Sequence, residues 1–236
     1  MLIKPNLIIL KICYIFGPLW NQEGNIKQPY FTISFCFTYE KCKELNFVEK
    51  IYTSFFNNNF KYLKPCYEAT DWTLGKIINW NQNKLQNKFD LGFDEDISND
   101  YKQIYLSNKN YNEIRLFWIY EKDYIFLNLI VPLEDIFIEH NNISCYFKDK
   151  IFELINLCKI IFRKHNVELV ETLWELDGSE NLTDIFYKEF YPIFNPFGIV
   201  PNYLFNKLDL DFKSKYNLTE GTFNYKIFLL KNIILI

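Results

Sequence analysis

Arginine and alanine are nearly missing from this chain of 236 residues. Arg115 and Arg163 are its only arginines and Ala69 is its only alanine, whereas Asn, Lys, Ile, Phe and Tyr are common. The codons of the common residues are rich in A and T, so we attribute this bias to an AT-rich genome rather than to function. The shortage of arginine still removes the residue best suited to bidentate contacts with phosphate and guanine.

Glycine is also scarce, and this excludes the familiar phosphate-binding loops. The 7 glycines are isolated, and neither G-x-x-x-x-G-K-[ST] nor G-x-G-x-x-G nor G-x-S-x-G occurs. A loop that cradles phosphate needs closely spaced glycines, because backbone N–H groups must approach the anion. We therefore expect no nucleotide and predict no cofactor.

Histidine, the commonest acid–base residue, occurs only as His140 and His165. Cys158 precedes His165 on one predicted helix, but a helix would separate them by about 10 Å along its axis. They cannot form a local dyad, although a partner from elsewhere in the fold stays open. We expect His165 to lie at the C-terminus of its helix, where the helix dipole favours it. Clusters of Cys and His with zinc-ligand spacing are absent, so no metal site is predicted.

The 6 cysteines are irregularly spaced and include no C-x-x-C pair. Disulfide frameworks belong mainly to small secreted chains, so we expect free thiols in a reducing compartment and a cytoplasmic location. The apolar run at residues 7–16 is shorter than the ~20 residues that span a bilayer. We interpret it as a buried first strand and predict no membrane association.

The formal net charge of −3 and the pI of about 5.6 indicate a mildly acidic protein. Its lysines are scattered among Asp and Glu and form no basic stripe, which a nucleic-acid binder usually carries. We therefore predict no nucleic-acid binding. Acidic surfaces raise the rate of encounter with basic partners, so a protein with a basic surface is the expected partner.

Hydrophobic periodicity predicts an α+β fold. In the strand 31–38, Phe31, Ile33, Phe35 and Phe37 share one face, while Thr32, Ser34, Cys36 and Thr38 share the other. Helices are expected over 40–60, 72–87 and 145–165, a hairpin over 113–131, and strands over 167–174, 208–212 and 223–230. We predict one domain over residues 1–236, with a single mixed or antiparallel sheet and two or three helices packed on one face.

Prolines divide an aromatic-rich segment that runs from Tyr187 to Phe205. Aromatic side chains on an irregular backbone suit protein recognition. A long loop that packs its own small core explains the pattern equally simply, and we expect this second arrangement.

Two acidic segments, 90–100 and 168–184, are the predicted contact surfaces. The first lacks the ligand order and the glycine position of an EF-hand, so it is not expected to bind calcium. The residues that we predict to contact a partner are Asp94, Glu95, Asp96, Asp100, Glu171, Glu175 and Asp177.

The absence of catalytic signatures favours a non-enzymatic protein-binding domain. One form of this hypothesis is a neutraliser of a basic toxin or enzyme, by fold-level analogy with bacterial immunity proteins, although no motif of such a family is present. Two alternatives stay open, a carboxylate-dependent hydrolase that uses Glu171, Glu175 and Asp177, and a structural protein. Converging carboxylates in a pocket would favour the hydrolase.

Overall fold

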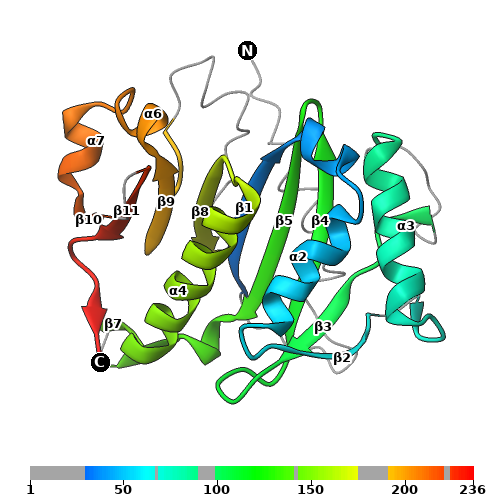
Figure 1. Ribbon diagram of the computed structural model, residues 1–236. Helices are drawn as coiled ribbons and strands as arrows, with labels where there is room; N and C mark the ends of the chain where they lie inside the picture. Colours follow the sequence, from blue (N-terminus) through cyan, green and yellow to red (C-terminus); the bar gives the residue numbers. More distant parts are fainter. Residues whose placement is uncertain (1–29, 67–68, 90–98, 141–142, 175–190, 221–223) are drawn as a thin grey trace, which may run out of the picture.

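A computed structural model describes residues 30–66, 69–89, 99–140, 143–174, 191–220 and 224–236. These residues form a large antiparallel sheet, a small second sheet and several helices (Figure 1), which confirms the predicted α+β class. The strand predicted at residues 7–16 lies outside the described residues.

The described residues form the following helices and strands. Their order is β1 (Tyr30–Thr38), η1 (Tyr39–Lys43), α2 (Phe47–Phe56), β2 (Lys61–Pro65), α3 (Leu74–Gln86), β3 (Ile104–Ser107), β4 (Ile114–Glu121), β5 (Tyr124–Pro132), η4 (Leu133–Asp135), β6 (Phe137–His140), β7 (Ile143–Tyr146), α4 (Lys148–His165), β8 (Leu169–Trp174), β9 (Phe197–Pro201), α6 (Asn202–Phe205), α7 (Leu210–Ser214), β10 (Tyr216–Glu220), β11 (Tyr225–Leu230) and β12 (Ile234–Leu235).

The large sheet has nine strands in the order β10-β11-β9-β8-β1-β5-β4-β3-β2. Each neighbouring pair is antiparallel, and the central strand β1 lies between β5 and β8. The predicted hairpin 113–131 is confirmed as β4 and β5, which pair from Arg115 with Ile130 to Glu121 with Tyr124. A second sheet of three strands has the order β12-β7-β6.

The main core fills the face of the large sheet that α2, α3 and α4 cover (Figure 1). Phe31, Ile33, Phe35 and Phe37 of β1 are all 0% exposed and belong to this core, as the alternation in their sequence predicts. Both α2 and α4 direct apolar stripes into it, with Ile51 and Phe55 from one helix and Ile151 and Cys158 from the other among the buried residues.

A second cluster lies on the opposite face of the sheet, toward β9, β10 and β11. It contains Cys36 of β1, Leu204 of α6 and Phe212 of α7, packed with Phe194 and Phe228. The prediction of a single sheet with two or three helices on one face is met only in part: α2, α3 and α4 cover one face, but α6 and α7 cover the far side and a second sheet is present. Phe194 and Phe205 of the aromatic-rich segment pack in this cluster, which is the small core expected for that segment.

Local backbone signals account for the wrong element boundaries. The predicted helix 40–60 is split, because Asn46 adopts a left-handed conformation with φ of 57°, and Leu45 is 79% exposed. The predicted strand 208–212 is instead the start of α7, since the Asp209 side chain accepts a hydrogen bond from the Phe212 N–H and caps a helix there. Residues 143–146, which overlap the start of the helix predicted over 145–165, form β7.

Candidate functional site

The acidic residues predicted to contact a partner are only partly covered by the structure. Asp100 is half-buried ahead of β3, and its backbone oxygen accepts a hydrogen bond of 2.9 Å from Trp80 Nε1. Glu171 lies within β8. The other predicted residues lie outside the described part of the chain: Asp94, Glu95, Asp96, Glu175 and Asp177.

Glu171 lies in the interior rather than on a charged surface. Its strand β8 is flanked by β1 and β9, and the residue is only 5% exposed. The Ile193 backbone N–H donates a hydrogen bond of 2.9 Å to Glu171 Oε1. Glu171 therefore presents almost no surface to a protein partner. Its carboxylate can contact only groups that lie inside the fold or enter it.

A row of buried polar side chains crosses three central strands beside Glu171. Ser34 of β1 pairs in register with Glu171 on one side and with Asn128 of β5 on the other. Register partners in an antiparallel sheet share a face. Ser34 and Asn128 are each 9% exposed. The three residues thus form a line about 10 Å long at the usual strand spacing. We call them the polar row.

The residues around the polar row are mixed in character. Thr32 lies two residues before Ser34 on the same face of β1 and is also 9% exposed. Arg115 of β4 is 6% exposed, and its guanidinium lies over the Tyr30 ring at 4.8 Å from the ring centroid. Phe117 pairs in register with Asn128 and is 3% exposed, so an aromatic ring bounds the row on the β4 side.

The sequence contains a signal for each member of this row, but the signals differ in strength. The alternation of β1 places Ser34 on the correct face, and the charge of Glu171 singles it out. Asn128 is the functional candidate that sequence reasoning missed, although it is the one polar residue in the otherwise apolar run from Ile125 to Val131. An asparagine is disfavoured in the middle of a strand, and this conflict is the signal that could have found it.

His165 has a partner from another helix, which sequence spacing could not reveal. Its Nε2 atom lies 2.7 Å from Ser54 Oγ of α2, and Ser54 is 1% exposed. The Ser54 hydroxyl also lies 3.1 Å from the Lys50 carbonyl oxygen, within hydrogen-bond distance. Because Ser54 is almost fully enclosed, the pair does not present a nucleophile to a substrate.

Burial also lowers the basicity of His165. Desolvation, reinforced by Lys164, Lys50 and Lys41, lowers the pKa of His165 to about 4, while Glu44 acts in the opposite direction. The residue ends α4, as expected. The expected benefit of a charged imidazolium at the helix dipole is outweighed here, since the ring is neutral at pH ~7 with this pKa.

The described thiols are shielded rather than activated. Cys36, Cys42, Cys66 and Cys158 are buried and free. Burial raises the pKa of Cys36 and of Cys158 well above the ordinary value, raises the pKa of Cys66, and raises the pKa of Cys42 to about 11. A nucleophilic cysteine needs a lowered pKa and access to solvent, and these four residues have neither.

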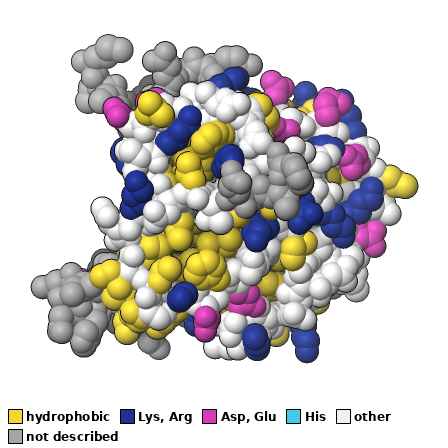
Figure 2. All heavy atoms as spheres, turned by 60° about the vertical axis from the view of Figure 1, so that its left-hand side comes forward, with side chains coloured by type: hydrophobic (Ala, Val, Ile, Leu, Met, Phe, Trp, Pro, Cys, Tyr) yellow, Lys and Arg dark blue, Asp and Glu magenta, His cyan; other side chains and the backbone are white. Residues whose placement is uncertain are grey.

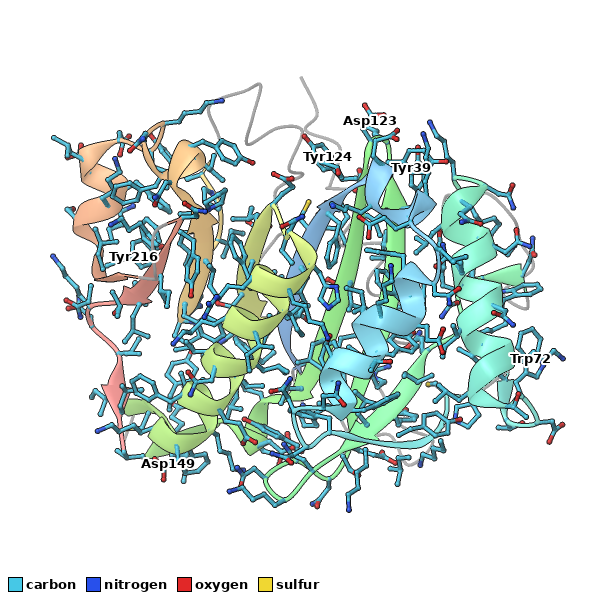
Figure 3. The ribbon with its side chains drawn as sticks, in the orientation of Figure 1. Tyr39, Trp72, Asp123, Tyr124, Asp149 and Tyr216 are labelled. Atoms are coloured by element: carbon cyan, nitrogen blue, oxygen red, sulfur yellow. The ribbon has the colours of Figure 1, made fainter. Side chains whose placement is uncertain are left out.

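Open depressions occur at opposite ends of the described fold. One, of about 470 Å³, is bounded by Tyr39, Asp123 and Tyr124 at the upper end of the sheet in Figure 3. Another, of about 520 Å³, runs along α4 from Asp149, which is labelled at the lower end of the same view.

Each depression has two carboxylates in its lining, and one of the two is already engaged. In the upper depression Glu40 accepts a hydrogen bond of 2.7 Å from Lys43 Nζ. In the lower one Glu153 Oε1 accepts a hydrogen bond of 2.9 Å from Asn108 Nδ2. Neither depression therefore resembles a hydrolase site in which two free carboxylates act together as acid and base.

The small sheet exposes an apolar outer face. Ile138, Cys145 and Ile234 are register partners across β6, β7 and β12, and Ile138 and Ile234 are 41% and 45% exposed. Ile236 follows with 59% exposure. The small sheet lies on the left side of Figure 1. Figure 2 turns this side toward the reader and shows hydrophobic side chains gathered on it. We call Ile138, Ile234 and Ile236 the apolar face.

Charged side chains lie near the apolar face. The Lys148 N–H donates a hydrogen bond of 2.8 Å to the Ile236 carbonyl oxygen, which places the exposed Asp149 close to the end of β12. Glu139 follows Ile138 along β6 and is also exposed, but successive strand residues point to opposite faces, so Glu139 belongs to the other face of the small sheet. Lys148 is exposed beside Asp149, so charges of both signs lie at this edge of the apolar face.

Neither a metal centre nor a membrane span is found in the described residues. No group of three or more His, Cys, Asp and Glu side chains in that part of the chain is arranged to hold a metal ion. Among its helices, none combines the length and the apolar character needed to cross a bilayer.

Comparison of the chain with protein-family models, with curated proteins and with solved structures finds no match. Its function must therefore be inferred from the residues of this chain alone.

Proposed function

We propose that this protein is a binding domain that docks another protein through the apolar face. The observation that carries this proposal is the set of three isoleucines with exposures of 41–59% on the outer side of the small sheet. Exposed apolar clusters rimmed by polar residues mark protein–protein contacts. Burying them in a complex would yield roughly 25 cal/mol per Å² of apolar surface.

The expected partner has an apolar centre and a basic rim. Asp149 lies near the end of β12 beside the apolar face and favours lysine or arginine at that edge of the partner surface. Rim charges of this kind act mainly on the rate of association and on specificity. A basic toxin or enzyme that the chain neutralises in the cytoplasm is the specific partner class that we propose.

The acidic segment containing Asp94, Glu95, Asp96 and Asp100 stays a second proposed contact surface, and Glu175 and Asp177 belong to the same proposal. A hydrolase that uses paired carboxylates is less well supported. Glu171 is the described member of that set, and the acidic residues proposed to act with it lie outside the described residues.

Affinity capture from the native host, with tagged wild-type chain and tagged Ile234→Arg, tests the proposal. We expect one partner to be recovered with the wild type and lost, by at least about tenfold, with Ile234→Arg, because a desolvated arginine in an apolar contact costs more than one factor of ten in affinity. Leu210→Arg is the matched control, since Leu210 of α7 is 80% exposed and lies outside the apolar face.

Equal recovery of the partner with wild type, Ile234→Arg and Leu210→Arg would rule out the apolar face. The double variant Asp94→Lys and Asp96→Lys then examines the acidic segment separately. Loss of the partner with that variant alone would move the contact to residues 90–100.

A further inference from the structure

We infer that the polar row is a binding site for a small hydroxyl-rich ligand with the size and polarity of a monosaccharide. This site is independent of the proposed docking surface, because the apolar face lies on the small sheet and the polar row lies across β8, β1 and β5 of the large sheet.

The first reason is that the row contradicts the local rules for a buried strand. Its members stand in the middle of central strands, where apolar and β-branched residues are favoured and asparagine and glutamate are not. Asn128 is preceded by Leu127 and followed by Leu129, which are both 0% exposed. Such local conflicts are expected at functional sites, where selection for binding outweighs selection for stability.

The second reason is that the neutral members of the row lack hydrogen bonds to the rest of the described protein. Within that part of the chain, no hydrogen bond is made by the side chains of Ser34 and Asn128, although each residue is only 9% exposed. Neither side chain is among the fully enclosed polar atoms that lack a partner in that part of the chain, so the polar atoms of Ser34 and Asn128 keep access to solvent or to a ligand. Both side chains face the same side of the sheet as Glu171.

The third reason is the combination of donors and acceptors, which selects the class of ligand. A carboxylate only accepts, an amide both donates and accepts, and a hydroxyl does either. A ligand hydroxyl can donate to Glu171 and accept from Asn128 Nδ2. A ligand amine could satisfy Glu171 but only donates, and would leave the Asn128 amide group without an acceptor.

The spacing of the charges argues against a free amino acid. Glu171 and Arg115 lie three strands apart, on β8 and β4, which is about 14 Å at the usual strand spacing. The ammonium and carboxylate groups of one amino acid are too close together to reach both. A neutral polyol about as long as the row fits the three side chains without using Arg115.

Binding is measured by calorimetry and ligand-observed NMR with glucose, galactose, ribose and inositol as probes, and with putrescine and sulfate as separate arms. We expect saturable binding of at least one polyol. Glu171→Gln and Asn128→Val should each weaken that binding about tenfold or more, since each removes hydrogen bonds to the ligand. Glu171→Gln keeps an acceptor for the Ile193 N–H, so the fold is preserved.

Thr38→Val is the matched control, because Thr38 lies at the end of the same face of β1 and outside the row. It should leave polyol binding unchanged. Putrescine or sulfate binding without polyol binding would overturn the ligand class. Absence of binding by every probe would overturn the site.

The melting temperature of the ligand-free protein provides a second readout. If Ser34 and Asn128 served only to stabilise the fold, their substitution would lower it. Ser34→Ala and Asn128→Val should leave it unchanged or raise it by about 2–4 °C, because no internal hydrogen bond is lost. A fall in the melting temperature with both variants would show that these side chains bond within the protein, and the inference would fail.

Discussion

His165 shows how the surroundings of a single residue decide its charge. The sequence places it at a helix end, where a positive charge is favoured. The fold places it against Ser54 and near Lys41, Lys50 and Lys164, with Glu44 as the opposing carboxylate. The net effect is a neutral ring with a pKa of about 4.

This shift makes a prediction for the pH dependence of stability. In the unfolded chain His165 takes up a proton near pH ~6.5, whereas in the folded chain it does so only at about 4. Between these values the unfolded state binds more protons, so the free energy of unfolding falls as the pH is lowered through this window. Denaturant unfolding between about pH 7 and pH 4.5 should show a shallower fall for His165→Gln than for wild type.

Carboxylates also titrate in this window, and comparison of the two proteins removes their common contribution. Ser54→Ala is the companion variant, since it leaves the imidazole in place and should retain the wild-type slope more closely than His165→Gln. Identical slopes for wild type and His165→Gln would contradict the lowered pKa.

At the scale of elements, the second cluster depends on a glycine in β9. Gly198 pairs with Phe228 of β11, and a Cβ atom at Gly198 would lie 1.9 Å from Phe194 Cδ1. Phe194 is 1% exposed and contacts Phe212, Tyr216 and Phe228. The Phe194 ring therefore occupies the space that any other residue at position 198 would need.

Gly198→Ala should lower the free energy of unfolding by about 1–3 kcal/mol, the usual cost of overpacking a core. Chemical denaturation measures the change. Gly75→Ala is the control, because no atom lies within 4 Å of a Cβ atom there. In helix α3 this change should be neutral or stabilising by up to about 1 kcal/mol. Equal effects of the two substitutions would refute the packing argument.

The elements also show what periodicity can and cannot locate. The strand at 31–38 and the hairpin at 113–131 are predictable because their alternation or β-former content is strong over many residues. The edges of helices are displaced, since they depend on single events such as the left-handed Asn46 and the cap at Asp209. Short strands such as β6, β7 and β12 carry too few residues to show a period, and pairing with one another defines them.

At the scale of the whole molecule, the thiols test the prediction that the chain is one domain. Cys36 belongs to the second cluster and Cys158 to the main core, on opposite faces of the large sheet. If both faces unfold together, both thiols become accessible only when the whole fold opens.

Native-state labelling with a thiol reagent at mildly alkaline pH, followed by peptide mass spectrometry, should therefore modify Cys36 and Cys158 slowly and at equal rates. Both rates should rise steeply with denaturant, in parallel with loss of the circular dichroism signal. Labelling of Cys36 at much lower denaturant than Cys158 would show that the β9 to β11 end unfolds separately, and two cooperative units would replace one.

The sequence by itself determined the α+β class, the two faces of β1 and the burial of its apolar set, because a strong alternation over nine residues and a helical periodicity over several turns are local properties of the sequence. It also identified Glu171 as a residue of interest, although by charge and not by position. Only the tertiary structure decided that Glu171 stands beside Ser34 and Asn128, since that neighbourhood arises from strand pairing between segments 94 and 137 residues apart in the chain. Strand order and register are set by the packing of the whole sheet, and no local pattern specifies them.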